Sequence, residues 1–361
     1  MSKIDSSGIR KVFDLAAKMT DPINLSIGQP DFDVPELAKR ETIRAIEDGL
    51  NKYTPTQGIP ELREGIRRLM RQTRDWEPEA VLVTSGVSGG IMLALNALVD
   101  PGDEVLIGDP YFVMYKHITS LLGGVPVFVD TYPDFRLTAE RIEKTLTPKS
   151  KVLLLNSPCN PTGVVSSSEE LSDIADLAKA HDLIVVSDEI YESFCYDGEF
   201  VSIVRFLEHA VVLGGFSKSY GMTGWRLGYA CGDADIIGEM TKLQQFTFVC
   251  APSMVQQAGV VALGTDVSGH IDEFRRKRDL MYDGLQDVFE VTRPEGAFYI
   301  FPRVPEGTDE AFVKRAIEAN CLVIPGSVFS QRNTHFRISY ANSFDQLRRG
   351  IEVLRTLTSS Q

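Results

Sequence analysis

The sequence predicts a three-layer α/β fold, with a large domain built on a mainly parallel sheet and a smaller α+β domain built from both chain ends. Short apolar runs of strand length alternate with stretches of helical spacing between about Val81 and Cys231, which is typical of a parallel sheet covered on both faces. Long charged stretches of helical spacing and further strand-like runs come after it. We therefore expect a large domain over residues 36–270 and a small domain made of residues 1–35 and 271–361.

Composition and charge limit what the protein can be. The chain has 361 residues and a net charge of −13, so a basic face for nucleic acid is not expected. Five dispersed cysteines without a Cys-x-x-Cys pair, and five unclustered histidines, indicate neither a disulfide framework nor a metal site. The sequence has no long uncharged apolar run and does not start like a signal peptide, so we expect no membrane contact and a cytoplasmic location.

The individual elements follow from apolar spacing and turn residues. Ser167 and Glu170 have the spacing of a capping box, and the apolar residues 171, 174, 175 and 178 share one face of the helix behind them. The other expected helices cover residues 9–19, 91–98, 138–146, 234–248 and 272–289. The expected strands cover residues 81–84, 104–108, 125–129, 151–156, 183–186, 210–213, 227–231, 296–301 and 334–339.

The stretch Gly214–Tyr229 carries the clearest chemical signal. Lys218 stands among small residues, which let another molecule approach its ammonium group and hold little water there. Desolvation and nearby cations lower the pKa of such a lysine and make it a nucleophile for carbonyls. Arg226, eight positions on, is a planar cation that suits a phosphate. Together they suggest pyridoxal phosphate held as a Schiff base; the alternative is an exposed lysine in a glycine-rich loop.

These residues resemble the lysine signature of the class I/II aminotransferases, the fold-type I pyridoxal-phosphate enzymes. Every position of residues 215–218 and 224–228 fits the family pattern, and further landmarks follow in order over nearly the whole chain. The resemblance implies a pyridoxal-phosphate-dependent transaminase. Such an enzyme moves an amino group from an L-amino acid to a 2-oxo acid, here through a Lys218 Schiff base.

The resemblance also assigns the phosphate side of the cofactor site. The small-residue turn Ser85–Gly90, between a strand and a helix, offers free backbone N–H groups to an anion, although a plain connection would have the same composition. The family pattern makes Ser88 and the Gly89 amide phosphate donors, together with Arg226 and, as a possible extra donor, Ser217. Phe112 takes the place of an aromatic residue, often tryptophan, that stacks on the pyridine ring.

Two polar clusters are assigned to the ring itself. Asp188 follows the buried strand 183–186, where ligands gather in parallel sheets, although a helix N-cap would explain it as well. The resemblance makes Asp188 the partner of the pyridine nitrogen, and places Tyr191 and Asn160 at the phenolic oxygen. It also implies a cis peptide bond before Pro161.

The substrate side rests on Arg337, Gly28 and Asn160. Arg337 stands between apolar neighbours and could be a salt-bridge partner on a strand, but the resemblance makes it the bidentate clamp for the substrate α-carboxylate. Gly28 lies in a stretch that on its own predicts only a loop. The resemblance implies that this loop lines the carboxylate side of the substrate and that the glycine leaves room for the ligand. Tyr53 is either a packed aromatic or the family tyrosine that reaches the cofactor phosphate of the other subunit. The latter implies a homodimer with shared active sites.

The expected catalytic residues are Lys218, Asp188 and Tyr191. Freed Lys218 would carry the proton between the substrate Cα and the cofactor C4′. A carbon–sulfur β-lyase or a γ-eliminating synthase on the same fold would keep Lys218, Asp188 and Arg337, so it stays an alternative. A cofactor-binding transcriptional regulator is disfavoured, because residues 1–30 are too few for a winged helix. Some dicarboxylate-preferring relatives have lysine where Ser88 stands, so a neutral or aromatic donor is expected.

Overall fold

The structure is a computed structural model that describes residues 19–359. The expected helix at residues 9–19 therefore lies outside the described residues, apart from its last position. In the described part, strands run β1 (Ile23–Asn24), β2 (Ala80–Thr84), β3 (Glu104–Asp109), β4 (Val125–Asp130), β5 (Ser150–Asn156), β6 (Ile184–Asp188), β7 (Val211–Gly215), β8 (Gly228–Gly232), β9 (Tyr299–Ile300), β10 (Cys321–Leu322), β11 (Ile324–Pro325) and β12 (Phe336–Ser339). Helices run α2 (Glu36–Glu47), α3 (Pro60–Arg74), α4 (Gly86–Leu98), α5 (Met114–Leu121), α6 (Ala139–Glu143), α7 (Ser168–Ala180), α8 (Ala234–Gln245), α9 (Ser253–Ala262), α10 (Ser268–Leu285), α11 (Asp309–Glu318) and α12 (Phe344–Ser359).

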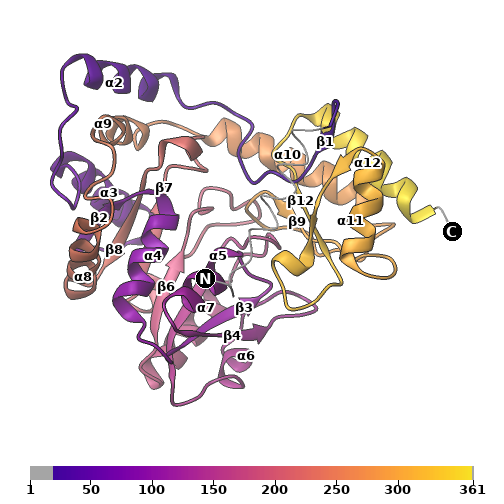
Figure 1. Ribbon diagram of the computed structural model, residues 1–361, viewed down its shortest axis with the longest axis horizontal. Coiled ribbons are helices and arrows are strands. Elements are labelled where there is room, and N and C mark those ends of the chain that lie inside the picture. The colour runs from indigo at the N-terminus through magenta and orange to yellow at the C-terminus, as the bar shows by residue number, and fades with distance from the viewer. Residues whose placement is uncertain (1–18, 360–361) are drawn as a thin grey trace.

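A seven-stranded sheet forms the centre of the larger part of the molecule (Figure 1). Its strand order is β2-β8-β7-β6-β5-β3-β4. The neighbours from β7 to β4 are parallel, and β8 runs antiparallel between β7 and β2. The mainly parallel sheet expected from the sequence is confirmed.

Both faces of this sheet are buried. Successive strand residues point to opposite faces, and the residues on each face pack into an apolar core of their own. Leu153 and Leu155 of β5 belong to one apolar core, together with side chains of α3, α7 and α9. Val152 and Leu154 belong to the other core, with side chains of α4, α5 and α8. The result is the helix–sheet–helix layering of an α/β fold.

The smaller part joins the two ends of the described chain. Strand β1 pairs in parallel with β10, so Ile23 lies opposite Cys321. In Figure 1 β1 lies beside α12, and the three-stranded sheet β11-β12-β9 lies near α11, away from α2 and α9. This agrees with the expected α+β region from both chain ends; the boundaries at residues 35/36 and 270/271 remain predictions.

Several element boundaries differ from those expected. Helix α4 begins at Gly86 rather than at residue 91, so the supposed turn 85–90 is mostly the first part of the helix. Gly86 has a φ of +67°, which lets the chain turn immediately after β2. The strand expected over 296–301 is formed only at Tyr299–Ile300. Gly296 makes a separate, isolated bridge with Cys195. Helix α6 ends at Glu143, three residues early.

Local signals at the helix ends were reliable. The capping box at Ser167 and Glu170 is present at the start of α7, and residues 171, 174, 175 and 178 are buried as expected. Within residues 19–359, no helix combines the length and apolarity that a membrane span requires.

Candidate active site

A cavity of about 230 Å³ lies where several parallel strands end. Its walls come from the chain just after β2, β3, β5, β6 and β7, which is the carboxyl edge where α/β sheets bind ligands. Ten of the twelve predicted site residues line it: Gly28, Ser88, Phe112, Asn160, Asp188, Tyr191, Ser217, Lys218, Arg226 and Arg337. Gly89 belongs to the same end of α4 but does not line the cavity, and Tyr53 lies outside it with 85% of its surface exposed.

Lys218 lies in the segment between β7 and the short 3-10 helix Thr223–Trp225. Its Nζ donates to the Gly28 carbonyl oxygen at 2.7 Å and lies 5.6 Å from the ring centres of Tyr191 and Phe298. Enclosure by protein, and then the charge of Arg337, lower the pKa of Lys218 to about 8, while Asp188 opposes the shift. A larger fraction of this amine is therefore neutral near pH 7 than for an exposed lysine, which favours attack on a carbonyl.

Asp188 ends β6 and is buried. Its Oδ2 accepts from the Tyr115 hydroxyl at 2.7 Å, and its Oδ1 accepts from the Ile190 N–H at 3.2 Å. Burial raises the pKa of Asp188 to about 6, and these hydrogen bonds limit the rise, so the carboxylate is mainly ionised at pH 7. No helix begins behind Asp188, because residues 190–193 form a turn, so the N-cap alternative is wrong.

The side-chain amide of Asn156, at the end of β5, links the Asn160 loop to the end of β6. Asn156 Nδ2 donates to the Asp188 carbonyl oxygen at 3.0 Å, and Asn156 Oδ1 accepts from the Asn160 N–H at 2.9 Å. The Asn160–Pro161 peptide bond is cis, as expected. These contacts bring Asn160 to the same side of the cavity as Arg337.

Arg337 is buried on β12 with 1% of its surface exposed. Nη1 donates to Asn160 Oδ1 at 3.0 Å and Nη2 to the Ser26 carbonyl oxygen at 2.9 Å, whereas Nε has no partner. The guanidinium lies between the rings of Tyr299 and Phe329, 4.4 Å from each centroid.

The surroundings of Arg337 fit an anion-binding group. Among residues 19–359 no ion pair involves it, so the salt-bridge alternative is not what the structure shows. Burial lowers the pKa of Arg337, because nothing charged compensates the guanidinium. A buried cation with an unpartnered N–H suits a carboxylate brought by a substrate.

Arg226 lies over the first turn of α4. Its Nη2 donates to the Ser85 carbonyl oxygen at 3.3 Å and its Nη1 to the Thr223 carbonyl oxygen at 3.0 Å. A Cβ on Gly86 would come within 2.8 Å of Nη2, so glycine is required there for this approach. A guanidinium beside the N-terminal N–H groups of a 13-residue helix, with Ser88 in the same turn, is a site that fits a phosphate.

Seven lining residues were not among the predicted site residues: Val87, Ile91, Tyr115, Asn156, Ile190, Thr223 and Tyr299. Tyr115 stands three positions after Phe112 and packs edge-on against it at 5.6 Å, so helical spacing could have found it. The Tyr299 hydroxyl lies 2.8 Å from the Tyr191 hydroxyl. No sequence signal points to that contact, because 108 residues separate the two tyrosines.

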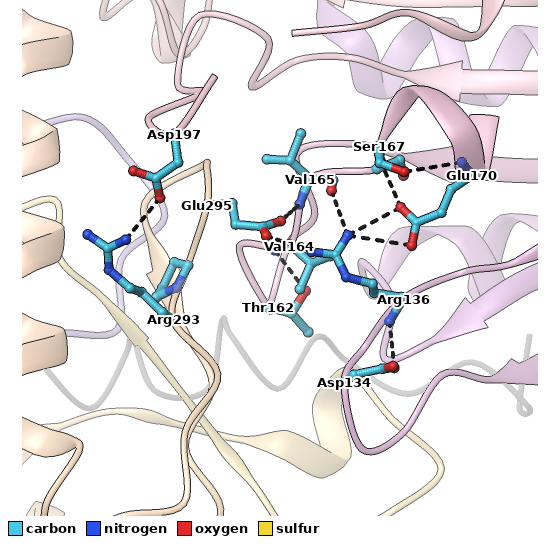
Figure 2. A network of polar contacts seen from close by, with 12 residues as sticks. Asp134, Arg136, Thr162, Val164, Val165, Ser167, Glu170, Asp197, Arg293 and Glu295 are labelled. Atoms are coloured by element: carbon cyan, nitrogen blue, oxygen red, sulfur yellow. Dashed lines mark hydrogen bonds and ion pairs between the residues drawn. The ribbon is translucent and has the colours of Figure 1, made fainter. Parts of the chain in front are cut away.

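A polar network around Arg136 and Glu295 holds the chain that follows Asn160, including Val165 (Figure 2). Arg136 contacts Glu295 Oε1 at 2.6 Å and Glu170 Oε2 at 3.2 Å, and the Val165 N–H donates to Glu295 Oε2 at 3.0 Å. The Gly163 carbonyl oxygen accepts from the N–H groups of residues 295 and 296, each at 2.8 Å. The loop is thus fixed to the segment that leads into Tyr299.

Together, the fold brings into one cavity a buried lysine with a lowered pKa, an arginine over the first turn of α4, and a buried arginine without an ion pair. The chain belongs to the class I and II aminotransferases: the model of the family "Aminotransferase class I and II" matches residues 20–354. It is 38% identical to the "Probable aspartate aminotransferase" of Methanocaldococcus jannaschii, covering 98% of this chain and 97% of that protein. It is 37% identical to "Aromatic-amino-acid aminotransferase 2" of Thermococcus litoralis, covering 98% and 95%.

Solved structures agree with these relatives. The aspartate aminotransferase of Thermus thermophilus with maleate superposes with a TM-score of 0.94 at 36% identity, covering 98% of this chain and 97% of that one. The fold class, the recognition of the family and the interpretation as a transaminase are therefore confirmed. Nothing in these relatives favours the carbon–sulfur lyase alternative. Within residues 19–359 no cluster of three or more His, Cys, Asp or Glu side chains could hold a metal ion.

Proposed function

We propose that this transaminase binds pyridoxal 5'-phosphate on Lys218 and transfers amino groups between a neutral or aromatic L-amino acid and a 2-oxo acid. We further propose that it works as a cytoplasmic homodimer with shared active sites. The observation that carries the proposal is one cavity in which a lysine with a pKa of about 8 lies near an ionised Asp188 and an unpaired Arg337. Class I and II aminotransferases depend on this cofactor in general, and the donor set described above fits it.

Each part of the cavity suits one part of the cofactor. Arg226 and the first turn of α4, with Ser88, the Gly89 amide and Ser217, would hold the phosphate. Asp188 would face the pyridine nitrogen and keep it protonated, because its carboxylate is ionised and buried. Three further lining residues would complete the ring site, Phe112 by stacking and Asn160 and Tyr191 at the phenolic oxygen.

When bound, the cofactor supplies a sink for the electrons of the substrate Cα–H bond. Arg337 would bind the α-carboxylate and, with Gly28 also lining the cavity, fix the orientation of that bond. Lys218 would be the group that takes the substrate Cα proton and delivers a proton to the cofactor C4′. Its pKa of about 8 suits both directions near neutral pH.

The preference for a neutral or aromatic donor follows from a count of charges. The cations that line the cavity within the described residues are Lys218, Arg226 and Arg337, and each already has a role. None remains for a second substrate carboxylate, and the side walls include Ile91, Phe112 and other apolar groups. The names of the relatives include both aspartate and aromatic aminotransferases, so they do not decide this point.

A second copy of the chain is the partner that the exposed apolar residues fit. Leu37, Ile43 and Ile46 of α2, with Leu50 after it, expose between 40% and 61% of their surface. Tyr53 follows this face, and its ring would be desolvated in such an interface. A dimer through this face would bring Tyr53 toward the partner's cofactor phosphate.

The test is a screen of amino donors against 2-oxoglutarate and pyruvate with the purified, cofactor-loaded protein. We expect transfer from aromatic or neutral donors to exceed transfer from aspartate by tenfold or more, about the effect of one missing charge-assisted contact. Lys218→Ala should bind the cofactor but show no turnover. Wild-type protein that stays colourless with added pyridoxal phosphate would contradict the proposal, and efficient aspartate turnover would contradict the donor class alone.

A further inference from the structure

Tyr299 touches three of the groups just assigned. It is buried on β9, with 1% of its surface exposed, and lines the cavity. Its hydroxyl lies 2.8 Å from that of Tyr191, and its ring covers the Arg337 guanidinium at 4.4 Å. The same hydroxyl lies 2.4 Å from where a Cβ on Gly28 would stand. One side chain therefore connects the ring side of the site with the carboxylate side.

The hydrogen bond between the Tyr191 and Tyr299 hydroxyls can run in two directions, but only one of them leaves the Tyr191 proton free for the cofactor. Each tyrosine hydroxyl has one proton, and either could be the donor in the bond between them. When Tyr191 donates to the phenolic oxygen of the cofactor, its proton is used. Only Tyr299 can then donate, so the hydrogen bonds run from Tyr299 to Tyr191 and on to the cofactor.

We propose that Tyr299 is a positioning residue: its hydroxyl orients and polarises the Tyr191 hydroxyl, and its ring fixes the plane of Arg337. This inference rests on the proposed function, because it needs the cofactor at Tyr191 and a carboxylate at Arg337. It predicts that the two contacts separate, since phenylalanine keeps the ring and loses the hydroxyl.

Neither tyrosine acts as an acid or base in this arrangement. Burial raises the pKa of Tyr191 and of Tyr299, so both stay protonated over the working range. The charged groups that face the pair are Arg337 on β12 and Asp188 on β6, with Lys218 across the cavity. Their positions leave the hydroxyls to serve as neutral hydrogen-bonding groups.

The Tyr299 hydroxyl occupies the space that a side chain at position 28 would fill. The Gly28 carbonyl oxygen accepts from Lys218 Nζ at 2.7 Å, so its backbone is held against the site. Glycine is needed at this position for space, because any side chain would meet the Tyr299 oxygen. Gly28→Ala should therefore displace the hydroxyl and reproduce part of the loss caused by Tyr299→Phe.

The experiment compares Tyr299→Phe, Tyr299→Leu and the control Tyr340→Phe. Tyr340 is equally buried, and its hydroxyl donates to the Ala297 carbonyl oxygen at 3.2 Å outside the cavity. For Tyr299→Phe we expect kcat to fall about tenfold, the usual effect of a lost hydrogen bond to a charged system, with KM for the amino acid nearly unchanged. Tyr299→Leu should also raise KM, because Arg337 loses one of its two covering rings.

A spectroscopic titration provides a readout independent of turnover. A donor at Tyr191 draws charge from the phenolic oxygen, and less charge there holds the proton on the adjacent Lys218 nitrogen less tightly. Losing the Tyr299 hydroxyl weakens that donor. The visible absorption of the bound cofactor changes with pH as the Lys218 nitrogen loses its proton, and the midpoint of this change should rise in Tyr299→Phe. The midpoint of Tyr340→Phe should match the wild type.

The outcomes distinguish this inference from the proposed function. Wild type without a visible band or amino transfer would contradict the function itself. An active wild type beside a Tyr299→Phe variant with unchanged kcat and midpoint would contradict only the role of Tyr299. A variant with raised KM and an unchanged midpoint would contradict it too, because the hydroxyl would then contact the substrate directly. If Tyr299→Leu does not fold, Tyr299→Phe decides the question.

Discussion

Burial in the same cavity shifts the pKa values of Lys218 and Asp188 in opposite directions. Burial disfavours both charged forms, so it lowers the pKa of the lysine and raises that of the carboxyl. Their mutual attraction opposes both shifts. The resulting values of about 8 and about 6 leave Asp188 ionised at pH 7 and Lys218 within reach of its neutral form. A perturbed pair of this kind in a cavity is what an acid–base site requires.

The reaction of the apoprotein with pyridoxal phosphate should report the Lys218 pKa. The neutral amine is the nucleophile, so the rate should rise with pH and level off above about 8. Arg337→Met should move the midpoint up, since Arg337 lowers this pKa, and Asp188→Asn should move it down. The measurement is the initial rate of visible absorbance between about pH 6 and 10. A midpoint near the ordinary lysine value of about 10.4 would contradict this account.

Among the elements, α3 contributes the most deeply buried charge network. Arg74, its last residue, lies behind the sheet edge, where its Nε donates to Glu189 Oε2 at 2.9 Å and its Nη2 contacts Glu192. Ser187 and Ser202 donate to the other Glu189 oxygen. Glu189 follows Asp188 directly, so this network anchors the turn that carries Asp188 and Tyr191.

Removing the arginine should destabilise the protein strongly. Arg74→Met leaves two carboxylates without their cation, which costs about 3–5 kcal/mol in buried pairs. Arg71 on the same helix is the matched control, because its ion pairs with Glu64 and Glu77 are about half exposed. Arg71→Met should cost about 1 kcal/mol or less. Urea unfolding at fixed protein concentration measures both, and equal losses would show that the Arg74 network contributes little.

The Asn160 loop offers a second test at the scale of elements. Gly163 has a φ of +75°, and a Cβ there would lie 2.5 Å from Pro294 Cβ and 2.9 Å from the Tyr299 carbonyl oxygen. Gly102 has a φ of +95° with open space around it. Gly102→Ala should therefore cost only the left-handed backbone, about 1–2 kcal/mol. Gly163→Ala should cost more.

The catalytic readout separates the two glycines further. Gly163→Ala should displace the loop and raise KM for the amino acid, because Asn160 holds Arg337. Steady-state kinetics of both variants measures this. A Gly163→Ala enzyme with the KM of Gly102→Ala would show that the loop adapts without moving Asn160.

On the scale of the whole molecule, the proposed homodimer with shared active sites leads to a prediction that a monomer would not fulfil. Lys218→Ala and Tyr53→Ala should each impair a homodimer of this kind. A heterodimer of the two variants has one site with both changes and one site with neither. Mixing and re-equilibrating the two should restore about a quarter of wild-type activity, because half of the dimers are mixed and each has one intact site. Activity that stays at the sum of the two parents would contradict shared sites.

What could be predicted from the sequence depends on how local each signal is. Lys218, Asp188 and Asn160 stand in short signatures with their neighbours, so their positions were found, and the alternating strands gave the sheet. Tyr299 and Arg74 act through partners 108 and 115 residues away, respectively, and only packing brings them together. The start of α4 was missed because Gly86 and Ser88 look like turn residues, although the left-handed Gly86 opens the helix.

The central claim is that Lys218 forms the covalent bond to the cofactor, and reductive trapping tests it most directly. The loaded protein is treated with borohydride, digested and mapped by mass spectrometry, with Lys218→Ala as the control. We predict one pyridoxyl label per chain, on the peptide that contains Lys218, and none in the variant. A label on any other lysine, or no label in a protein that turns over substrate, would contradict the account.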